Sequence, residues 1–407
     1  MKGYWQLLKT HPRTLGFGLI FCFFSGYGQT HFISLFNPFF KEIYQLSNTD
    51  YGLIYSLVTL ASGIILPWVG PLIDKKDARW FGVAIAMGLI LCEVLLASFQ
   101  NLVILCLALF GLRLFGQGLS SHIAATTMAR YFEEQRGKAL SLAFSGFPIY
   151  EGLITPLCAY ILGFISWQSL SWSLALIAAF TLLPLSYWLT KNIPEFNFPR
   201  REEEIETQSQ DRGRRQWTRK QVYSHPLIYL LLIQFLMPPF SLTGLLFHQA
   251  AIGEFKGWSL SIIASGLSFF ALGRFFTAFL AGPLVDRYTA RRLYPYYQIP
   301  LTIGFLGMSL LSYSWIPALC FIGFGITVGS GAPIKSAIWP ELYGTRHLGA
   351  IKSSFATIMV MSTAASPFLF GWILDQQQQA ESLLLAMAIL SLVAAALSIL
   401  GLKRYGF

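Results

Sequence analysis

Six ionisable residues lie inside long apolar stretches of this sequence, where an isolated charge is costly. They are Arg113, Arg274, Lys335, Lys352, Glu93 and Glu151. Because charges in a hydrocarbon environment are rare and expensive, such residues are candidates for ligand binding or proton transfer. Four bases against two acids leave the interior net positive, which favours an anionic ligand.

The two bases Arg113 and Lys335 can supply the cation for such a ligand. Arg113 can hold a carboxylate through two parallel hydrogen bonds, or it can bond to backbone carbonyls near the glycines that follow it. Lys335 can bind the same anion, or it can extend its ammonium to the membrane surface. Lys352 begins its stretch and suits an interfacial position, and we expect Glu93 to face lipid-side neighbours.

Other side chains in these stretches can titrate or donate hydrogen bonds. Burial favours the neutral form of a carboxyl and a nearby Arg favours the ionised form, so Glu151 can carry a proton or act as a static partner for a base. His31, His122 and His248 titrate near neutral pH, although a packing histidine with satisfied hydrogen bonds is the alternative for each. Gln29 lies close to His31 in the sequence and can add hydrogen bonds to a solute.

The elements that must position these residues are apolar stretches long enough to cross a bilayer. Hydrophobic residues make up 55 % of the 407 residues and charged residues only 12 %, against about 25 % charged residues in soluble domains. About 20 apolar residues span a bilayer. The stretches are 15–40, 51–73, 80–99, 102–130, 139–164, 167–190, 226–252, 259–285, 294–313, 315–340, 347–373 and 380–402. We therefore predict an all-α integral membrane protein with 12 transmembrane helices.

One polar connection divides these stretches into two sets of six. It covers residues 192–222, is rich in both acids and bases, and has no apolar periodicity, which is typical of a surface linker. The predicted organisation is an N-terminal six-helix bundle (1–191), a linker (192–222) and a C-terminal six-helix bundle (223–407).

Basic residues indicate the orientation in the membrane. Most of the 29 Lys and Arg fall at the two ends, in the linker and in alternate connections, whereas the opposite connections hold only Lys41 and Lys256. Cytoplasmic loops carry the excess of Lys and Arg, so both termini and the linker are predicted to be cytoplasmic. The net charge of +10 is then a feature of topology, and we expect no nucleic-acid partner.

Two segments repeat the same pattern in the two halves. Gly70-Pro-Leu-Ile-Asp74 and Gly282-Pro-Leu-Val-Asp286 each end the second span of their half and are followed by basic residues, among them Arg79 and Arg291. Repeated halves are a feature of secondary transporters. With Arg113-Leu-Phe-Gly-Gln-Gly118 in the fourth span, the pattern resembles the major facilitator superfamily over the whole chain. Phe24-Ser-Gly-Tyr-Gly-Gln-Thr30 and Gly344–Ala350 resemble its bacterial branch near monocarboxylate and oxalate/formate carriers.

The resemblance implies roles for these loop residues. It implies a conformational latch made of Gly70, Asp74, Arg79, Gly282, Asp286 and Arg291. The glycines would let helices approach closely, and each Asp would face the positive N-terminal end of a neighbouring helix. A solvated loop that only sets topology is the alternative.

The resemblance also implies which residues face the substrate. The carriers that this sequence resembles place a substrate-binding Arg in the eighth span, where Arg274 lies, and spans 1, 4 and 7, which hold the three histidines, line the cavity. Two pseudo-symmetric bundles around that cavity would expose it to either side in turn.

These observations predict a secondary active transporter of a small organic anion such as a monocarboxylate, coupled to protons, in the inner (plasma) membrane. The sequence has no P-loop, G-x-S-x-G or H-E-x-x-H motif, so we expect no enzyme activity, no cofactor and no metal. Solute, protons and membrane lipid are the expected partners of a monomer. The alternatives are export of a drug or siderophore-like solute and a membrane sensor that binds without transporting.

Overall fold

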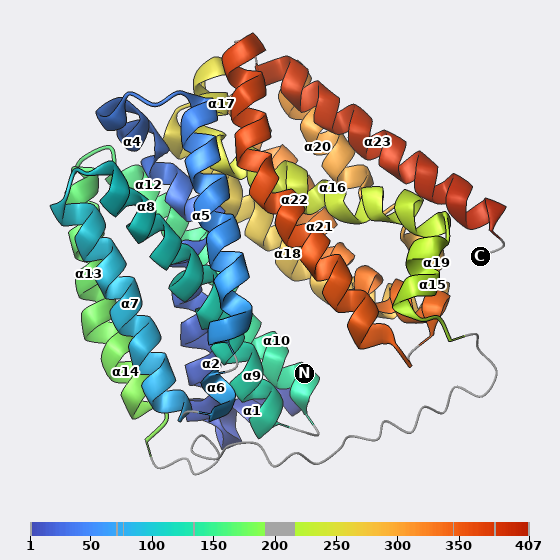
Figure 1. Cartoon of the computed structure of the whole chain (residues 1–407), viewed down its shortest axis with the longest axis horizontal. Helices are drawn as coiled ribbons and strands as arrows, with labels where there is room; N and C mark the ends of the chain where they lie inside the picture. Colours follow the sequence, from blue (N-terminus) through green and yellow to red (C-terminus); the bar gives the residue numbers. More distant parts are fainter. Residues whose placement is uncertain are drawn as a thin grey trace. The chain divides into compact units, whose positions relative to one another are not determined.

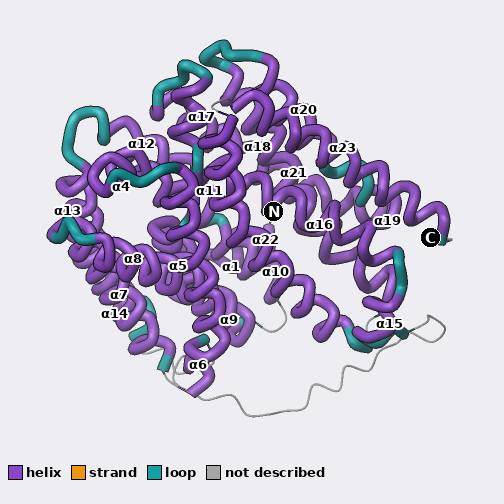
Figure 2. Tube along the Cα trace, turned by 45° about the horizontal axis from the view of Figure 1, so that its top comes forward, coloured by secondary structure: helices purple, strands orange, loops and turns teal. Residues whose placement is uncertain are grey.

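Long apolar runs, interrupted by polar caps and turns, form helices throughout the described part of the chain. The computed structural model describes residues 2–70, 72–75, 77–132, 135–191, 216–344, 346–377 and 380–405. Within these ranges the chain contains helices and connecting loops but no strand (Figure 2). It divides into two compact units, Met1–Glu202 and Glu203–Phe407, and the boundary between them falls inside the predicted linker.

The N-terminal unit contains the helices formed by the first six apolar stretches. In chain order they are α1 (Lys2–Thr10), α2 (Pro12–Phe24), η1 (Ser25–Gly28), α3 (Thr30–Ile33), η2 (Ser34–Phe36), α4 (Asn37–Tyr44), α5 (Asn48–Val69), α6 (Leu72–Lys75), α7 (Ala78–Ser98), α8 (Leu102–Gly111), η3 (Leu112–Ser120), α9 (Ser121–Tyr131), α10 (Arg136–Phe144), α11 (Gly146–Ile149), η4 (Tyr150–Ile154), α12 (Thr155–Ile161), α13 (Trp167–Ile177), η5 (Ala178–Leu182) and α14 (Leu183–Trp188). Within this unit α7 lies alongside α13 and α14 (Figure 1).

The C-terminal unit contains fewer and longer helices. They are α15 (Arg219–Ser224), α16 (Leu227–Phe247), α17 (Gln249–Phe255), α18 (Leu260–Tyr288), α19 (Ala290–Leu293), α20 (Ile299–Leu310), α21 (Ile316–Tyr343), α22 (Leu348–Gln377) and α23 (Ala380–Arg404). In this unit α16 packs against α22 and α23, and α18 packs along α21 (Figure 1). Glycines allow the second contact, because a Cβ at Gly325 or Gly329 would overlap the α18 backbone.

The predicted all-α membrane fold is confirmed. When consecutive segments such as α8, η3 and α9 are counted as one helix, ten helices of the described chain are long and apolar enough to cross a bilayer. Pro12–Gly28 and Thr30–Tyr44, bent by 45° from each other, bring the number to eleven if they count as one span. The predicted stretch 294–313 contains α20, which has 12 residues. At about 1.5 Å per residue this helix extends only about 18 Å, which is shorter than the roughly 30 Å hydrocarbon core of a bilayer.

Polar caps define where several of these helices begin. Ser47 and Asp50 form a capping box at the start of α5, Asn101 caps α8, and Ser166 caps α13. These side chains accept hydrogen bonds from amides that the helix itself leaves unpaired. The short polar turns between apolar runs therefore fix the ends of the spans.

The end of the predicted linker differs from the prediction. Thr218 and Gln221 form a capping box, and α15 begins at Arg219, so the stretch 192–222 includes the first turn of a helix. Just before it, the Trp217 amide donates to the Tyr343 carbonyl at 3.0 Å, and the indole packs edge-on against Tyr343. Residues 192–215 lie outside the described part of the chain.

Candidate functional site

The first span is broken where its sequence reads Ser25-Gly-Tyr-Gly-Gln-Thr30. The α-helix gives way to a 3₁₀ turn in η1, and Gln29 then adopts an extended conformation with φ −79° and ψ 145° before α3 begins. A break of this kind frees backbone polar groups inside a membrane protein, where they must find other partners. Such discontinuous helices commonly mark binding sites in transporters.

Close backbone contact with the fourth span holds this break in place. A Cβ at Gly28 would overlap the Leu112 carbonyl oxygen and lie 2.6 Å from the Gln117 amide and 3.0 Å from the Gly116 Cα. A Cβ at Gly116 would in turn lie 2.7 Å from the Gly28 amide. Two glycines are thus required where the Phe24–Thr30 and Arg113–Gly118 motifs cross.

Arg113 lies in this crossing, in the π-helical segment η3, and is 6 % exposed. Its Nη1 donates to the Gly28 carbonyl at 3.1 Å and to Thr30 Oγ1 at 3.4 Å. The guanidinium carbon lies 5.4 Å from the centre of the Tyr55 ring, and the Tyr55 hydroxyl donates to Thr30 Oγ1 at 3.0 Å. Arg113 therefore binds the freed carbonyl at the break, while its buried Nε has no hydrogen-bond partner in the described chain.

A histidine and an acid form a pair just after the break. His31 Nε2 lies 3.7 Å from Glu151 Oε1, and both side chains are buried. His31 Nδ1 lies 3.1 Å from Thr155 Oγ1. Glu151 belongs to η4, a second π-helical segment, and π-helical turns occur frequently at functional sites. The structure thus pairs two residues that the sequence suggested separately.

The other predicted ligands of the N-terminal unit lie at different places. The Gln29 side chain is half-buried and belongs to the residue at the break itself. The half-buried His122 lies instead against Gly70, where an added Cβ would be 3.4 Å from His122 Nε2. Because His122 follows Arg113 by nine residues, about 13 Å of helix separates them. His122 is therefore part of the Gly70 contact and not of the cluster around Arg113.

The predicted ligands of the C-terminal unit have different surroundings. His248 is buried at the end of α16, and its Nε2 lies 2.7 Å from the Pro367 carbonyl of α22. Lys335 places its ammonium 5.3 Å from the centre of the Phe235 ring. Arg274 is half-buried, and its backbone lies at the crossing of α18 with Gly325 and Gly329 of α21. Of the three, His248 has the environment of a packing residue.

The first repeated loop is tied to neighbouring spans by two arginines. Arg79 Nη2 donates to the Thr190 carbonyl at 3.3 Å, and its guanidinium lies over the Tyr187 ring. Arg130, at the end of the fourth span, donates to the Ile73 carbonyl at 3.3 Å. The side chain of Asp74 lies outside the described part of the chain. Arg79 therefore binds this loop to the end of the sixth span.

The second repeated loop differs from the sequence-based picture. The carboxylate at the N-terminus of α19 is not Asp286, which is exposed, but Glu341 of α21. Glu341 accepts hydrogen bonds from the Ala290 and Arg291 amides at 2.9 and 3.0 Å, and Arg291 Nε lies 3.8 Å from the same carboxylate. A Cβ at Gly282 would meet no described atom within 4 Å, so the predicted close helix approach is absent there in this structure.

Sequence reasoning missed three residues and misplaced one. Thr30, Tyr55 and Thr155 complete the hydrogen bonds around Arg113 and His31, but hydroxyl residues are too common in apolar helices to stand out. The prediction that Glu93 faces lipid is wrong, since Glu93 is 1 % exposed and packs inside the unit. Whether Glu93 points toward lipid or into the unit depends on which face of α7 turns inward, and its apolar sequence neighbours do not indicate that face.

Comparisons with known proteins agree with this fold. The family model described as Major Facilitator Superfamily matches residues 18–266 and, in a second match, 239–405. The chain belongs to this superfamily. The chain is also 27 % identical over 193 residues to the uncharacterized MFS-type transporter YcxA of Bacillus subtilis. That match covers 46 % of this chain and 47 % of YcxA, so the chain spans about half the length of this relative.

Solved structures of a bacterial homologue of the human lysosomal transporter Spinster share the fold. The inward-facing, unoccupied form matches with a TM-score of 0.69 and 14 % identity over 97 % of each chain. The inward-facing, occupied form matches with a TM-score of 0.66 and 15 % identity over 96 % of each chain. At this level of identity the likeness concerns the fold alone, and the finer assignment to a monocarboxylate or oxalate/formate branch stays a prediction.

Proposed function

We propose that this chain is a secondary active transporter of a small organic anion, such as a monocarboxylate, and that a proton accompanies the anion. Membership of the Major Facilitator Superfamily supports a transport function. The observation that carries the anion proposal is the arrangement of Arg113, whose two hydrogen bonds in the described chain both leave from Nη1. Its Nε is buried and has no hydrogen-bond partner in that part of the chain.

This arrangement suits a carboxylate ligand. A guanidinium binds a carboxylate best through two parallel N–H groups on one edge. With Nη1 bound to the break at Gly28, the edge that contains Nε is left for the ligand. Binding there would also supply the negative charge that a buried Arg lacks, since the contacts of Arg113 in the described chain are to neutral groups.

The pair of His31 and Glu151 supports a proton site beside the anion site. In this pair a proton can rest on the imidazole or on the carboxyl group, because the two groups face each other at 3.7 Å. His31 directly follows Thr30, to which Arg113 donates. Protonation of the pair would therefore change the field at the bound anion, which is the coupling that symport requires.

Residues of the C-terminal unit complete the proposal. Arg274 and Lys335 are half-buried bases in apolar spans, and each stays a proposed anion ligand, as does Gln29. His122 and His248 are weaker candidates, because the first lies against Gly70 and the second against the Pro367 carbonyl. We further propose alternating access between two sides of the membrane, a monomeric protein in the plasma membrane and cytoplasmic termini. Accessibility of a C-terminal tag to protease in right-side-out and inverted vesicles tests the orientation.

Transport into proteoliposomes tests the function directly. Labelled formate, lactate and oxalate would be offered with and without an acid-outside pH gradient, and the proposal expects accumulation that the gradient drives. Arg113→Gln should reduce uptake about 10- to 100-fold, because a hydrogen bond to a charged group contributes about 1.5–3 kcal/mol. Arg292→Gln is the matched control, since Arg292 is an exposed base on the short helix α19.

Two further results separate this proposal from its rivals. Glu151→Gln should abolish accumulation driven by the pH gradient but keep exchange of internal for external anion, which needs no net proton movement. Normal uptake by Arg113→Gln would refute the assigned anion site, and normal uptake by Arg274→Gln would refute the binding role proposed for Arg274. Saturable binding of an anion without flux would instead favour the sensor, and transport of larger solutes only would favour the exporter.

A further inference from the structure

A buried acid that the proposed function does not use lies in the third span. Glu93, five residues before the end of α7, is 1 % exposed. Its Oε2 atom has no hydrogen-bond partner in the described chain. Among the described residues no base lies in ion-pair contact with it, in contrast to Glu151, which faces His31.

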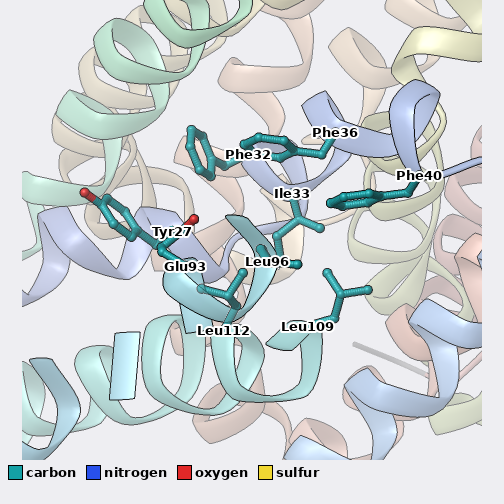
Figure 3. A pocket seen from close by; sticks show the side chains of 9 residues that line it. All are labelled: Tyr27, Phe32, Ile33, Phe36, Phe40, Glu93, Leu96, Leu109 and Leu112. Atoms are coloured by element: carbon teal, nitrogen blue, oxygen red, sulfur yellow. The ribbon is translucent and has the colours of Figure 1, made fainter. Parts of the chain in front are cut away.

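The surroundings of Glu93 are apolar and closed. The gap that it lines is walled by Phe32, Phe36 and Phe40 of the first span on one side and by Leu109 and Leu112 on the other (Figure 3). The space is too tight to admit a water molecule. An ionised carboxylate in such a place would have neither water nor a counter-charge, which costs many kcal/mol more than keeping the acid neutral.

The titratable groups that face Glu93 from the neighbouring spans are all neutral acids. They are Tyr27 of the first span, Tyr150 and Cys158 of the fifth, and Cys92 of its own helix. The Tyr27 hydroxyl already donates to the Leu174 carbonyl at 3.1 Å. Ser171 of α13 lies within reach of the Glu93 carboxyl and can interact with it, but neither the Ser171 hydroxyl nor Glu93 Oε2 makes a hydrogen bond of good geometry in the described chain. None of these groups can neutralise a carboxylate.

The part of the first span that covers Glu93 is the leg beyond the break. Phe32, Phe36 and Phe40 all lie in Thr30–Tyr44, which is bent by 45° from Pro12–Gly28. A leg attached through an extended residue can change its angle more easily than a continuous helix. Movement of this leg would open the gap to water and allow the carboxyl to ionise.

We propose that Glu93 is a second proton-binding site, separate from His31 and Glu151, which holds its proton while Thr30–Tyr44 packs over it. When that leg moves away, the O–H bond of the acid breaks, the proton passes to the entering water and the carboxylate becomes hydrated. Proton binding thus favours the packed position of the leg. This inference goes beyond the proposed anion transport and does not depend on it.

Infrared absorption of the purified protein in nanodiscs tests the proposal without any substrate. A protonated carboxyl has a carbonyl band that an ionised carboxylate lacks, and the band shifts in heavy water. We expect a band of one carboxyl in the wild type at neutral pH that disappears in Glu93→Gln. Glu42→Gln is the matched control, since Glu42 is an exposed acid on α4, and it should leave the band unchanged. Persistence of the band in Glu93→Gln, or its loss in Glu151→Gln alone, overturns the proposal.

Two measurements extend the test if the band is weak or Glu93→Gln is poorly expressed. Phe36→Ala, which opens the wall over Glu93, should make the band disappear at a lower pH than in the wild type, and an unchanged titration contradicts the role of the leg. Thermal unfolding should show Glu93→Gln gaining stability over the wild type as the pH rises, because only the wild type then pays to keep its acid neutral. A band that appears only when sodium is removed would identify a sodium site and overturn the proton assignment.

Discussion

Replacing Gly28 with Ala tests the packing on which the candidate site rests. The added methyl group would overlap the Leu112 carbonyl oxygen and lie 2.6 Å from the Gln117 amide and 3.0 Å from the Gly116 Cα. Carbon atoms pack at about 3.5–4.0 Å, so the first span would have to move by about 1 Å. All three obstacles are backbone atoms of η3, and no side-chain rotation can relieve them.

The expected cost follows from this overlap. Overpacking a close contact costs about 1–3 kcal/mol, and rigid backbone on both sides puts Gly28→Ala near 3 kcal/mol. At about 2–4 °C per kcal/mol for a unit of roughly 200 residues, the melting temperature should fall by roughly 6–12 °C. The same shift would draw the Gly28 carbonyl away from Arg113 Nη1, now at 3.1 Å, so anion affinity should fall as well.

Thermal unfolding in detergent, followed by tryptophan fluorescence, measures the effect. Gly137→Ala is the control, because a Cβ at Gly137, on α10, meets nothing within 4 Å. That substitution should be neutral or stabilise by up to about 1 kcal/mol, since Ala is the better helix former. If Gly28→Ala melts with the wild type, the backbone contact between the first and fourth spans is not as close as described, and the placement of Arg113 by the break fails with it.

Three further substitutions, one of them with Asp286→Asn as its control, test contacts of the C-terminal unit. Glu341→Ala should cost about 1 kcal/mol in thermal unfolding because it removes the acceptor of two backbone amides at a helix N-terminus, whereas Asp286→Asn should have no effect. Glu381→Gln removes the ionised partner of the buried Lys256 ammonium, 3.1 Å away, and should lower the melting temperature more in low salt than in high salt, because the Glu381 side chain is 43 % exposed and salt screens the pair in part. Trp217→Ala should speed amide hydrogen exchange in the loop after α21, because it removes the indole that packs edge-on against Tyr343, the last residue of that helix.

The membrane fold could be predicted because it depends on hydropathy summed over about 20 residues. Each of the 12 predicted apolar stretches corresponds to a helix or to a bent pair of helices in the structure. The break in the first span could not be predicted in the same way, because the broken segment Ser25–Thr30 contains no proline that would mark it. Gly28 packs at the break against Gly116, 88 residues later in the chain, and no local sequence pattern predicts such a contact.

The two repeated loops share a sequence pattern but do not make the same contacts. The pattern at Gly70 and Gly282 suggested one packing role for both, yet only Gly70 has a close neighbour among the described residues. Likewise the acid at the N-terminus of α19 comes from Glu341, about 50 residues beyond the loop that supplied the candidate Asp286. A duplicated motif preserves topology more reliably than it preserves individual contacts, because each half has diverged around its own neighbours.

The candidate site combines predicted residues with a geometry that only the fold reveals. Arg113, His31 and Glu151 were singled out because charge and titration are unusual in apolar spans, and that criterion is independent of where each helix turns. Their grouping depends on the break at Gln29, which carries Thr30 to Arg113 and His31 to Glu151 as consecutive residues. Since adjacent side chains leave a backbone in different directions, one short segment contacts a cation through Thr30 and an acid through His31. Any movement of the break must therefore change both contacts together, which is the physical requirement for coupling an anion to a proton.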